Sequence, residues 1–420
     1  MKPYESYMDT PESHWYSKLP ISWKSQKLRT LFGERRTIVS DKDYPALSVG
    51  GAGIVPQLKT AVKTNNGNNR KLICAGDFAI NSRSDRKGAC GISEYTGSCS
   101  LIITVLRPHS ELNNHFFHYL LRSHFFSEEF YRNGFGIVSD LWTTRWKNMR
   151  NIPAPVPPRE EQEQIVRFLD WKVSAIDKLI ATKEKQLSIL KELLQAKIEK
   201  QLHAYPISNT LRLKQLGTFS KGGGFSRDNL VETETYPAIL YGDIYTQYEY
   251  KTSVIPHHID GIAYSASRKI SKGDIVMAGT GETKDDIGKS ILYMGNQSVA
   301  VGGDVIIFHP NAKNNAEYLL YQLYSQAALK HRYISSKGDI IVHIYPTAIG
   351  NILITLPCVH DQKKAVKRIN ANIHRVNKTL HLLNEQISNL NELKTRLISD
   401  AVTGKIDVRS IKLPNFAKEE

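Results

Sequence analysis

Residues 151–202 read NIPAPVPPREEQEQIVRFLDWKVSAIDKLIATKEKQLSILKELLQAKIEKQL. From Arg159 to Leu202 this stretch contains neither proline nor glycine, and Pro157-Pro158 with the glutamates that follow form a helix start signal. The sequence therefore predicts one continuous helix over residues 159–202. At about 1.5 Å per residue such a helix is roughly 65 Å long, which exceeds the diameter of a small domain.

The same pattern returns at a fixed offset of 200 residues. The first copy contains Asn151-Ile152, Pro157, Glu161-Gln162, Ser188, Leu190 and Glu192-Leu193, and the second contains Asn351-Ile352, Pro357, Asp361-Gln362, Ser388, Leu390 and Glu392-Leu393. An ungapped match over about 40 positions indicates an internal duplication.

Both long segments carry apolar residues at heptad positions a and d. Polar residues interrupt the first seam at Lys183, Lys197 and Gln201 and the second at Lys394. Two narrow seams of matching length favour pairing of the helices with each other, and the alternative is that each packs on its own domain. The predicted pairing residues are Leu169, Val173, Ile176, Ile180, Leu187, Leu190, Leu194, Ile369, Ile373, Val376, Leu380, Leu383, Ile387, Leu390 and Leu397.

The two globular halves share a weaker common order. Gly273-Asp274-Ile275-Val276 echoes Gly76-Asp77-Phe78-Ala79, and Tyr318-Leu319-Leu320 echoes Tyr119-Leu120-Leu121. Helices are predicted over 116–130 and 316–330, and strands over 77–80, 101–106, 270–278, 291–294 and 299–308. The predicted fold class is α+β, with two repeated mixed α/β domains separated by two long helices that pair as an antiparallel coiled coil. The predicted parts are 1–152, 153–205, 206–352, 353–408 and a tail, 409–420.

The formal net charge of +15 indicates an anionic partner. Residues 1–158 contain 21 Lys and Arg against 13 Asp and Glu, whereas residues 203–357 contain 14 against 13. No stretch reaches the apolar length of a membrane-spanning helix, so nucleic acid fits better than a membrane. Cys74, Cys90, Cys99 and Cys358 follow no metal or redox spacing, and no signal peptide is visible after Met1, so we expect a cytoplasmic protein.

Motifs for catalysis are weak. The segment from Gly279 to Ser290 is too long between its glycines for a phosphate-binding loop. Asp274, Glu282 and Lys284 loosely resemble the Asp and Glu-x-Lys arrangement of Mg²⁺-dependent nucleases, and a self-sufficient nuclease is therefore one alternative function. A helical adaptor that does not bind DNA is another. No histidine lies in a metal-ligand spacing, and we expect no metal site.

Basic residues interleaved with aromatic residues on loops fit the reading of duplex DNA, because Lys and Arg bind phosphates and Arg also reads guanine. The predicted DNA-binding residues of the first half are Arg83, Arg86, Lys87, Tyr95, Arg132, Arg145 and Lys147. Those of the second half are Lys221, Arg227, Tyr241, Tyr245, Lys284, Arg332 and Lys337.

With these motifs the chain resembles the specificity subunit (HsdS) of a Type I restriction-modification system. The resemblance rests on PPREEQEQIV at 157–166, its degenerate copy at 357–362, LISDAVTGKI at 397–406 and the opening Leu19-Pro20-x-x-Trp23. The second half keeps Arg212-Leu213-x-x-Leu216 but lacks the Leu-Pro-x-x-Trp part, and the acidic run after Pro157 is largely lost after Pro357.

The resemblance implies a non-catalytic subunit with two target recognition domains, each reading one half of a bipartite, asymmetric DNA sequence. It implies that two methyltransferase subunits dock on the long helices and that restriction subunits join through them. No cofactor is expected on this chain, whereas S-adenosylmethionine, ATP and Mg²⁺ are expected on the partners.

Overall fold

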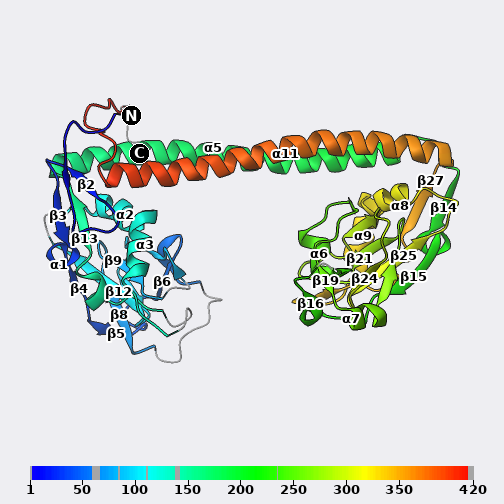
Figure 1. Cartoon of the computed structure of the whole chain (residues 1–420), viewed down its shortest axis with the longest axis horizontal. Helices are drawn as coiled ribbons and strands as arrows, with labels where there is room; N and C mark the ends of the chain where they lie inside the picture. Colours follow the sequence, from blue (N-terminus) through cyan, green and yellow to red (C-terminus); the bar gives the residue numbers. More distant parts are fainter. Residues whose placement is uncertain are drawn as a thin grey trace. The chain divides into compact units, whose positions relative to one another are not determined.

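The computed structural model describes residues 2–58, 67–83, 86–109, 112–137, 142–233 and 235–414. It consists of two compact units: unit 1 comprises residues 1–184 and 385–420, and unit 2 comprises residues 185–384. Each unit contains a globular α/β part together with half of each long helix, α5 (Arg159–Leu202) and α11 (Val359–Val402) (Figure 1). The predicted fold class is therefore confirmed.

Unit 1 is built on a four-stranded antiparallel sheet in the order β10-β9-β12-β4. Its strands are β4 (Phe32–Glu34), β9 (Phe78–Asn81), β10 (Cys90–Ile92) and β12 (Ile103–Pro108). A second sheet contains β5 (Ile38–Val39), β8 (Arg70–Ile73) and β11 (Gly97–Cys99). The strand pairs are β1 (Tyr7–Asp9) with β2 (Lys18–Pro20), β3 (Lys24–Lys27) with β13 (Pro153–Val156), and β6 (Leu47–Gly50) with β7 (Gly53–Pro56). The shorter helices are α1 (Leu28–Leu31), α2 (Asn114–Arg122), α3 (His124–Arg132) and α4 (Trp146–Met149).

Unit 2 repeats this plan on a five-stranded sheet in the order β15-β25-β21-β23-β18. Its strands are β15 (Gly217–Lys221), β18 (Lys251–Thr252), β21 (Ile275–Ala278), β23 (Ser290–Tyr293) and β25 (Val305–Pro310). The second sheet contains β16 (Leu230–Val231), β17 (Tyr236–Ile239), β19 (His258–Ile259), β20 (Arg268–Ile270) and β24 (Val299–Val301). The strand pairs are β14 (Asn209–Arg212) with β27 (Leu353–Leu356) and β22 (Thr280–Gly281) with β26 (Val342–His343). The shorter helices are η3 (Leu213–Gln215), η4 (Arg227–Asn229), α6 (Tyr241–Thr246), α7 (Gly261–Ala266), α8 (Ala316–Leu323), α9 (Gln326–Ser335) and α10 (Pro346–Ile349).

The two predicted amphipathic helices are each interrupted by a serine, and the prediction of continuous helices was wrong. Ser123 and Ser325 have extended backbones, and their hydroxyls accept hydrogen bonds from the amides of Phe126 and Ala328. A serine in this position starts a new helix because it caps an otherwise unbonded amide. The predicted strand over 299–308 is likewise divided, into β24 and β25.

The start of each long helix is stabilised by a repeated glutamine. Gln162 and Gln362 donate side-chain hydrogen bonds to the carbonyls of Pro157 and Pro357, at 2.8 and 3.0 Å. This contact explains why proline and glutamine recur five residues apart in both copies. Gln362 also accepts from the amide of Asn315 at 2.9 Å, whereas in the described part of unit 1 the buried Oε1 of Gln162 has no partner.

The acidic residue before each glutamine behaves differently in the two copies. Glu161 is buried and accepts hydrogen bonds from the indole of Trp23 at 3.0 Å and from the hydroxyl of Tyr4. Asp361 instead forms an ion pair with Lys364 at 3.3 Å. The Leu-Pro-x-x-Trp opening of the first half therefore anchors the first helix. The second half lacks this opening, and it also has Asp361 in place of the glutamate.

Within each unit the halves of α5 and α11 lie side by side and run antiparallel (Figure 1). In unit 1, Leu169, Ile176 and Ile180 share a core with Leu397. In unit 2, Leu194 shares a core with Ile369 and Val376. All fifteen predicted pairing residues are buried or half-buried. Near its end α5 buries Ile198 and Leu202 instead of Lys197 and Gln201, because there it packs on the globular part of unit 2.

Two of the polar residues that interrupt the seams make contacts across the helix pair of unit 1. The ammonium group of Lys183 donates to the side-chain oxygen of Gln386 at 2.6 Å, and that of Lys394 to the carboxylate of Asp177 at 2.7 Å. In the described residues, no helix combines the length and the apolar character needed to cross a membrane.

Candidate nucleic-acid interface

Each unit carries a short antiparallel pairing, here called the edge hairpin, that crosses the end of its main sheet. In unit 1, Phe135 and Thr143 exchange backbone hydrogen bonds of 3.1 and 2.9 Å, and Thr143 also bridges to Arg83, just beyond β9. In unit 2, Lys337 and His343 exchange bonds of 2.9 and 2.8 Å, and His343 pairs with Thr280, just beyond β21. The edge hairpins (residues 135–143 and 337–343) are thus the same element in both units, and residues 138–141 of the first lie outside the described part.

The edge hairpin of unit 1 borders a hollow of about 450 Å³, and two of the predicted DNA-binding residues line this hollow. Arg83 and Arg145 both line it, together with Lys71 and Trp146. The side-chain oxygen of Asn81 accepts from the amide of Arg83 at 3.1 Å, which fixes the turn that carries this arginine. Lys147 lies next to the hairpin, with its ammonium group 5.1 Å from the centre of the Phe135 ring. Cations and aromatic rings in such an arrangement suit phosphate contacts and base contacts.

The remaining predicted DNA-binding residues of unit 1 do not line this hollow. The ammonium group of Lys87 forms an ion pair with Glu128 at 2.6 Å, and Arg132 binds both carboxylate oxygens of Glu129 at 2.8 Å, which raises the pKa of the guanidinium. Arg86 is exposed and lies in the turn after Arg83, on the same side of unit 1 as Arg83. Tyr95 is 42% exposed, but it follows β10 at the opposite end of β9 from Arg83. The structure therefore does not place Tyr95 with the other predicted residues.

In unit 2 two adjoining hollows, of about 380 and 730 Å³, meet at Tyr241 and Asp304. Arg227 lines the smaller hollow, and Tyr245, Glu282 and His343 line the larger one. Burial raises the pKa of the Tyr245 hydroxyl, which donates to the carbonyl of Thr280 at 3.1 Å.

The remaining cations of unit 2 flank these hollows. Lys221 is exposed at the end of β15 and is paired with Ile306, so it lies at the same end of the sheet as the end of β21. Lys284 pairs with Asp339 at 3.4 Å, and Lys337 is exposed at the base of the edge hairpin. Five predicted DNA-binding residues therefore lie at one end of unit 2: Lys221, Arg227, Tyr241, Tyr245 and Lys337. Lys284 is paired with Asp339 of the edge hairpin.

The prediction that Arg332 contacts DNA directly was wrong. Arg332 is only 3% exposed, and its guanidinium donates to the carbonyl of Gly288 and lies 5.9 Å from the Tyr324 ring. Burial lowers its pKa. Counted from the capping serines, Arg332 stands where unit 1 has the buried Phe130, so its environment is that of a core residue.

The residues of the nuclease alternative are not assembled into one site. Asp274 precedes β21, where its carboxylate accepts from the amide of Ser271 and contacts the His309 imidazole at 2.7 Å. Glu282 follows the other end of β21 and lines the larger hollow. In the described residues no cluster of three or more His, Cys, Asp or Glu side chains could hold a metal ion.

Exposed apolar residues at the tips of the edge hairpins were missed by the sequence analysis. Ile340 is 89% exposed and Ile341 57% exposed, in a tip fixed by Gly338 at a φ of +100°. Ile137 of unit 1 is 97% exposed at the corresponding place. The signal was an isoleucine that follows a glycine within one or two residues in both copies.

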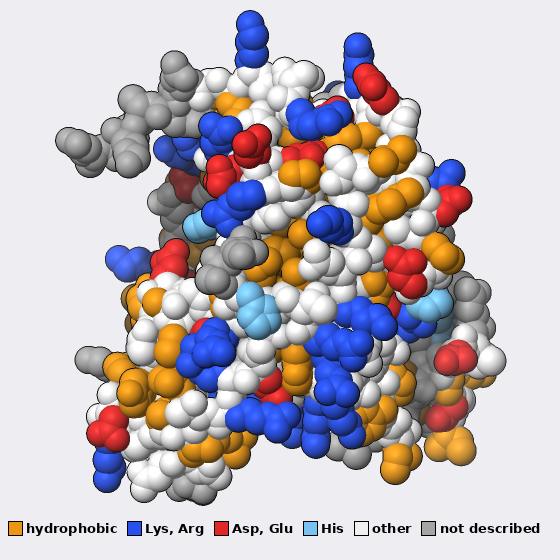
Figure 2. All heavy atoms as spheres, turned by 90° about the vertical axis from the view of Figure 1, so that its left-hand side faces the viewer, with side chains coloured by type: hydrophobic (Ala, Val, Ile, Leu, Met, Phe, Trp, Pro, Cys, Tyr) orange, Lys and Arg blue, Asp and Glu red, His pale blue; other side chains and the backbone are white. Residues whose placement is uncertain are grey.

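A basic surface on unit 1 was also missed. Figure 2 views the molecule from the side on which β3, β4 and α1 lie, and Lys and Arg side chains gather in the lower half of this face. The exposed basic residues on and next to these elements include Lys24, Lys27, Arg29, Arg36 and Arg107. Such a surface attracts a polyanion without reading its sequence.

The sequence matches the family described as Type I restriction modification DNA specificity domain over residues 20–191 and again over residues 208–390. No curated protein matches the chain.

The chain is similar to solved structures at low sequence identity. A chain from a study titled "Structural basis underlying complex assembly and conformational transition of the type I R-M system" is 16% identical, with a TM-score of 0.68, over 92% of this chain and 99% of that one. The HsdS subunit of Thermoanaerobacter tengcongensis is 16% identical over 94% of this chain and 100% of its own length, with a TM-score of 0.47. Because the family match covers most of both units, the chain belongs to the Type I restriction-modification DNA specificity family.

Proposed function

We propose that this chain is a non-catalytic DNA-recognition subunit in which each unit reads one half of a bipartite, asymmetric DNA sequence. The observation that carries the proposal is the repeated edge hairpin, which in each unit borders a hollow lined by polar and aromatic side chains, with Arg83 and Arg145 in unit 1 and carboxylates in unit 2. Two copies of one element with different side chains would read two different half-sites, because base edges are distinguished by the side chains that meet them.

The chemistry of the hollows differs between the two units. Unit 1 presents Arg83 and Arg145, which suit guanine and phosphate. Unit 2 presents the carboxylates of Glu282 and Asp304, which suit the amino group of cytosine. The proposed half-sites are therefore chemically distinct.

The proposal includes partners. Two methyltransferase subunits would dock on the long helices and carry S-adenosylmethionine, and restriction subunits with ATP and Mg²⁺ would join through them, in the cytoplasm. Family membership and the fold shared with a chain from a type I R-M assembly study support this part of the proposal.

The test is co-expression with the methyltransferase subunit of the same system, followed by sequencing that maps methylated adenines. A split motif with two fixed halves is expected, and exchange of residues 1–152 for those of another family member should change one half only. Methylation at unsplit sites would contradict the proposal. DNA cleavage by this chain alone with Mg²⁺, abolished in Glu282→Ala, would support the nuclease alternative instead.

A further inference from the structure

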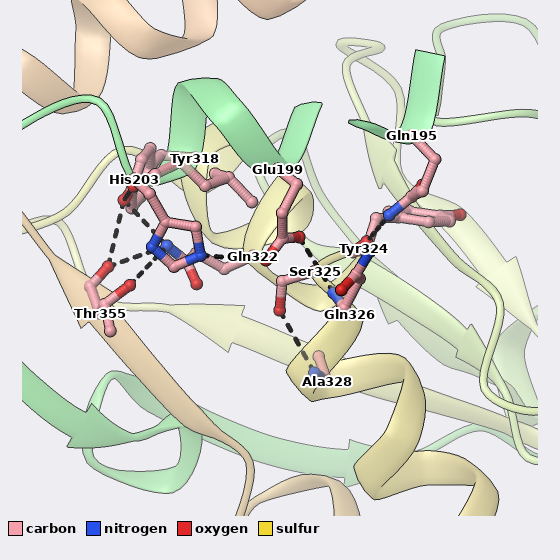
Figure 3. A network of polar contacts seen from close by, with 11 residues as sticks. Gln195, Glu199, His203, Tyr318, Gln322, Tyr324, Ser325, Gln326, Ala328 and Thr355 are labelled. Atoms are coloured by element: carbon pink, nitrogen blue, oxygen red, sulfur yellow. Dashed lines mark hydrogen bonds and ion pairs between the residues drawn. The ribbon is translucent and has the colours of Figure 1, made fainter. Parts of the chain in front are cut away.

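In unit 2 the end of α5 is joined to the start of α9 by a polar network (Figure 3). The carboxylate of Glu199 accepts from the backbone amide of Gln326, the first residue of α9, at 3.0 Å and contacts the His203 imidazole at 2.9 Å. One turn earlier, the side-chain amide of Gln195 donates to the carbonyl of Tyr324. An acidic side chain thus accepts a hydrogen bond from a backbone amide at a helix N-terminus, where amides lack partners within the helix and negative charge is favoured.

Unit 1 has the same helix start but lacks these side chains. Ser123 caps α3 as Ser325 caps α9, so His124 corresponds to Gln326. The offset of 200 places Thr395 and Ser399 of α11 where α5 has Gln195 and Glu199. Threonine and serine are too short to bridge to α3, and a hollow of about 710 Å³ lies between the two helices.

The floor of this hollow contains polar groups without partners. Ser399 is only 2% exposed, and in the described residues its hydroxyl has no hydrogen-bond partner. In the described residues the Ser123 hydroxyl accepts from the amide of Phe126, and no side chain accepts from the backbone amide of His124, in contrast to Gln326. A buried hydroxyl without a partner is unusual and favours an occupant that accepts hydrogen bonds.

The rim of the hollow is partly apolar and carries a cation. Phe125 is 37% exposed, and the ammonium group of Lys405 lies 4.7 Å from the centre of its ring. Asp400 and Glu392 also line the hollow, and Asp400 pairs with Arg396 at 3.5 Å and with Lys405 at 3.6 Å. The apolar rim suits a protein surface better than the phosphates of DNA, and Arg396 and Lys405 balance the charge of Asp400.

We propose that this hollow binds an acidic side chain of the methyltransferase subunit, which accepts from the His124 amide and the Ser399 hydroxyl as Glu199 does within unit 2. The site lies at the opposite end of α3 from Arg132 and therefore away from the nucleic-acid interface. It rests on the proposed function, because it assumes a methyltransferase partner. Unit 1 and unit 2 would then bind their partners differently, since unit 2 supplies its own carboxylate.

The test is to fill the hollow with a longer side chain of this protein itself. Ser399→Glu introduces the residue that unit 2 has, and it should weaken binding of the methyltransferase subunit to unit 1 by about tenfold or more, measured by calorimetric titration. Thr395→Gln copies Gln195 from an exposed position, and it should weaken binding in the same direction without disturbing the core. Thr30→Gln, the same exchange at an exposed position of α1 and off the long helices, is the matched control and should bind as the original chain does.

Several results would overturn the inference. If Ser399→Glu folds normally and still binds the methyltransferase subunit with unchanged affinity, the inference is wrong. If Ser399→Glu unfolds, unchanged affinity in Thr395→Gln contradicts the inference instead. Occupation of the hollow by inorganic phosphate, with no competition against the methyltransferase, would make it an anion site only. If the original chain binds DNA but no methyltransferase, the docking part of the proposed function fails first and this site fails with it.

Discussion

Arg332 shows how one position can serve different purposes in the two units. Unit 1 fills it with Phe130, and unit 2 fills it with a buried guanidinium whose Nε has no partner among the described residues. The carbonyl that Arg332 contacts, that of Gly288, also accepts from the Ser290 hydroxyl at 2.8 Å. Loss of the arginine would therefore leave no unsatisfied carbonyl.

We expect Arg332→Met to change the free energy of unfolding of unit 2 by less than about 1 kcal/mol, because a buried charge is replaced by an apolar chain of similar volume. Arg332→Ala should lower it by about 2–4 kcal/mol, because a cavity forms. Hydrogen exchange of the β21 and β23 amides measures both effects. Loss of DNA binding in a fully folded Arg332→Met variant would contradict the internal role.

His118 is a second residue whose environment differs from that of its counterpart. Burial lowers the pKa of its imidazole to about 4, and its Nδ1 accepts from the amide of Ile92 at 3.3 Å. In unit 2 the same place, counted from the capping serines, is taken by the buried Leu320. Unit 1 therefore contains a neutral histidine that the unfolded chain would protonate.

We expect the stability of unit 1 to fall as the pH is lowered from 6.5, the ordinary pKa, to about 4, because only the unfolded state takes up the proton in that range. The loss should reach about 3 kcal/mol at the lower end, and stability should be flat above the range. All five tryptophans belong to unit 1, so urea denaturation followed by tryptophan fluorescence reports this unit alone.

His118→Leu is the matched variant for this effect. It should flatten the pH profile of unit 1 and, above pH 6.5, lower its stability by about 1 kcal/mol, because the Ile92 amide loses its acceptor. An unchanged slope in His118→Leu would assign the pH dependence to another group.

At the scale of elements, the repeated glutamines offer an internal comparison. Gln362 bonds to Pro357 and to the amide of Asn315, and it also donates to the side chain of Asn314 at 3.1 Å. In the described structure the only hydrogen bond of the Gln162 side chain is to Pro157. The start of α11 is therefore tied to α8, and the start of α5 is not tied to α2 in this way.

We expect Gln362→Ala to destabilise unit 2 by about 2 kcal/mol, because it leaves a partly buried amide without its acceptor, and Gln162→Ala to destabilise unit 1 by about 1 kcal/mol. Hydrogen exchange in the first turns of α5 and α11 measures the difference. Equal effects of the two changes would mean that the bonds to the α8 start contribute nothing.

The sequence predicted the long elements well because their signals are local and repeated. The start of α5 at Arg159 and its end at Leu202 follow from the prolines before it and from the run without glycine or proline. The breaks at Ser123 and Ser325 could not be predicted in this way, because a serine inside an apolar pattern caps a new helix only when the chain turns there.

The candidate site was harder to predict than the fold. Arg83 and Arg145 are 62 residues apart, and only the pairing of Arg83 with the edge hairpin brings them to one hollow. Arg332 looks like a surface cation in the sequence, and its burial depends on a register within α9 that places it where unit 1 has a phenylalanine. Local composition gives the chemistry of such residues, but long-range contacts decide their exposure.

At the scale of the whole molecule, the positive charge is unevenly distributed. The first globular half carries a clear excess of Lys and Arg, and its hollow has Lys71, Arg83 and Arg145 against Glu34. The hollows of the second half have Arg227 against Glu282, Asp286 and Asp304. If both units bind one DNA duplex, most of the counterion release should come from unit 1.

This asymmetry predicts the salt dependence of DNA binding. The double change Arg83→Ala and Arg145→Ala should reduce the slope of log affinity against log salt by roughly 2, because about one phosphate contact is lost per residue. Lys284→Ala with Lys337→Ala should reduce it less, because the ammonium group of Lys284 is already paired with Asp339. Arg167→Ala with Lys178→Ala, both exposed on α5, is the control and should leave the slope unchanged. Fluorescence anisotropy with a labelled duplex at several salt concentrations measures all three. Equal slopes for the two site variants would mean that both units neutralise phosphates to the same extent, and the acidic side chains of unit 2 would then have to face away from the DNA.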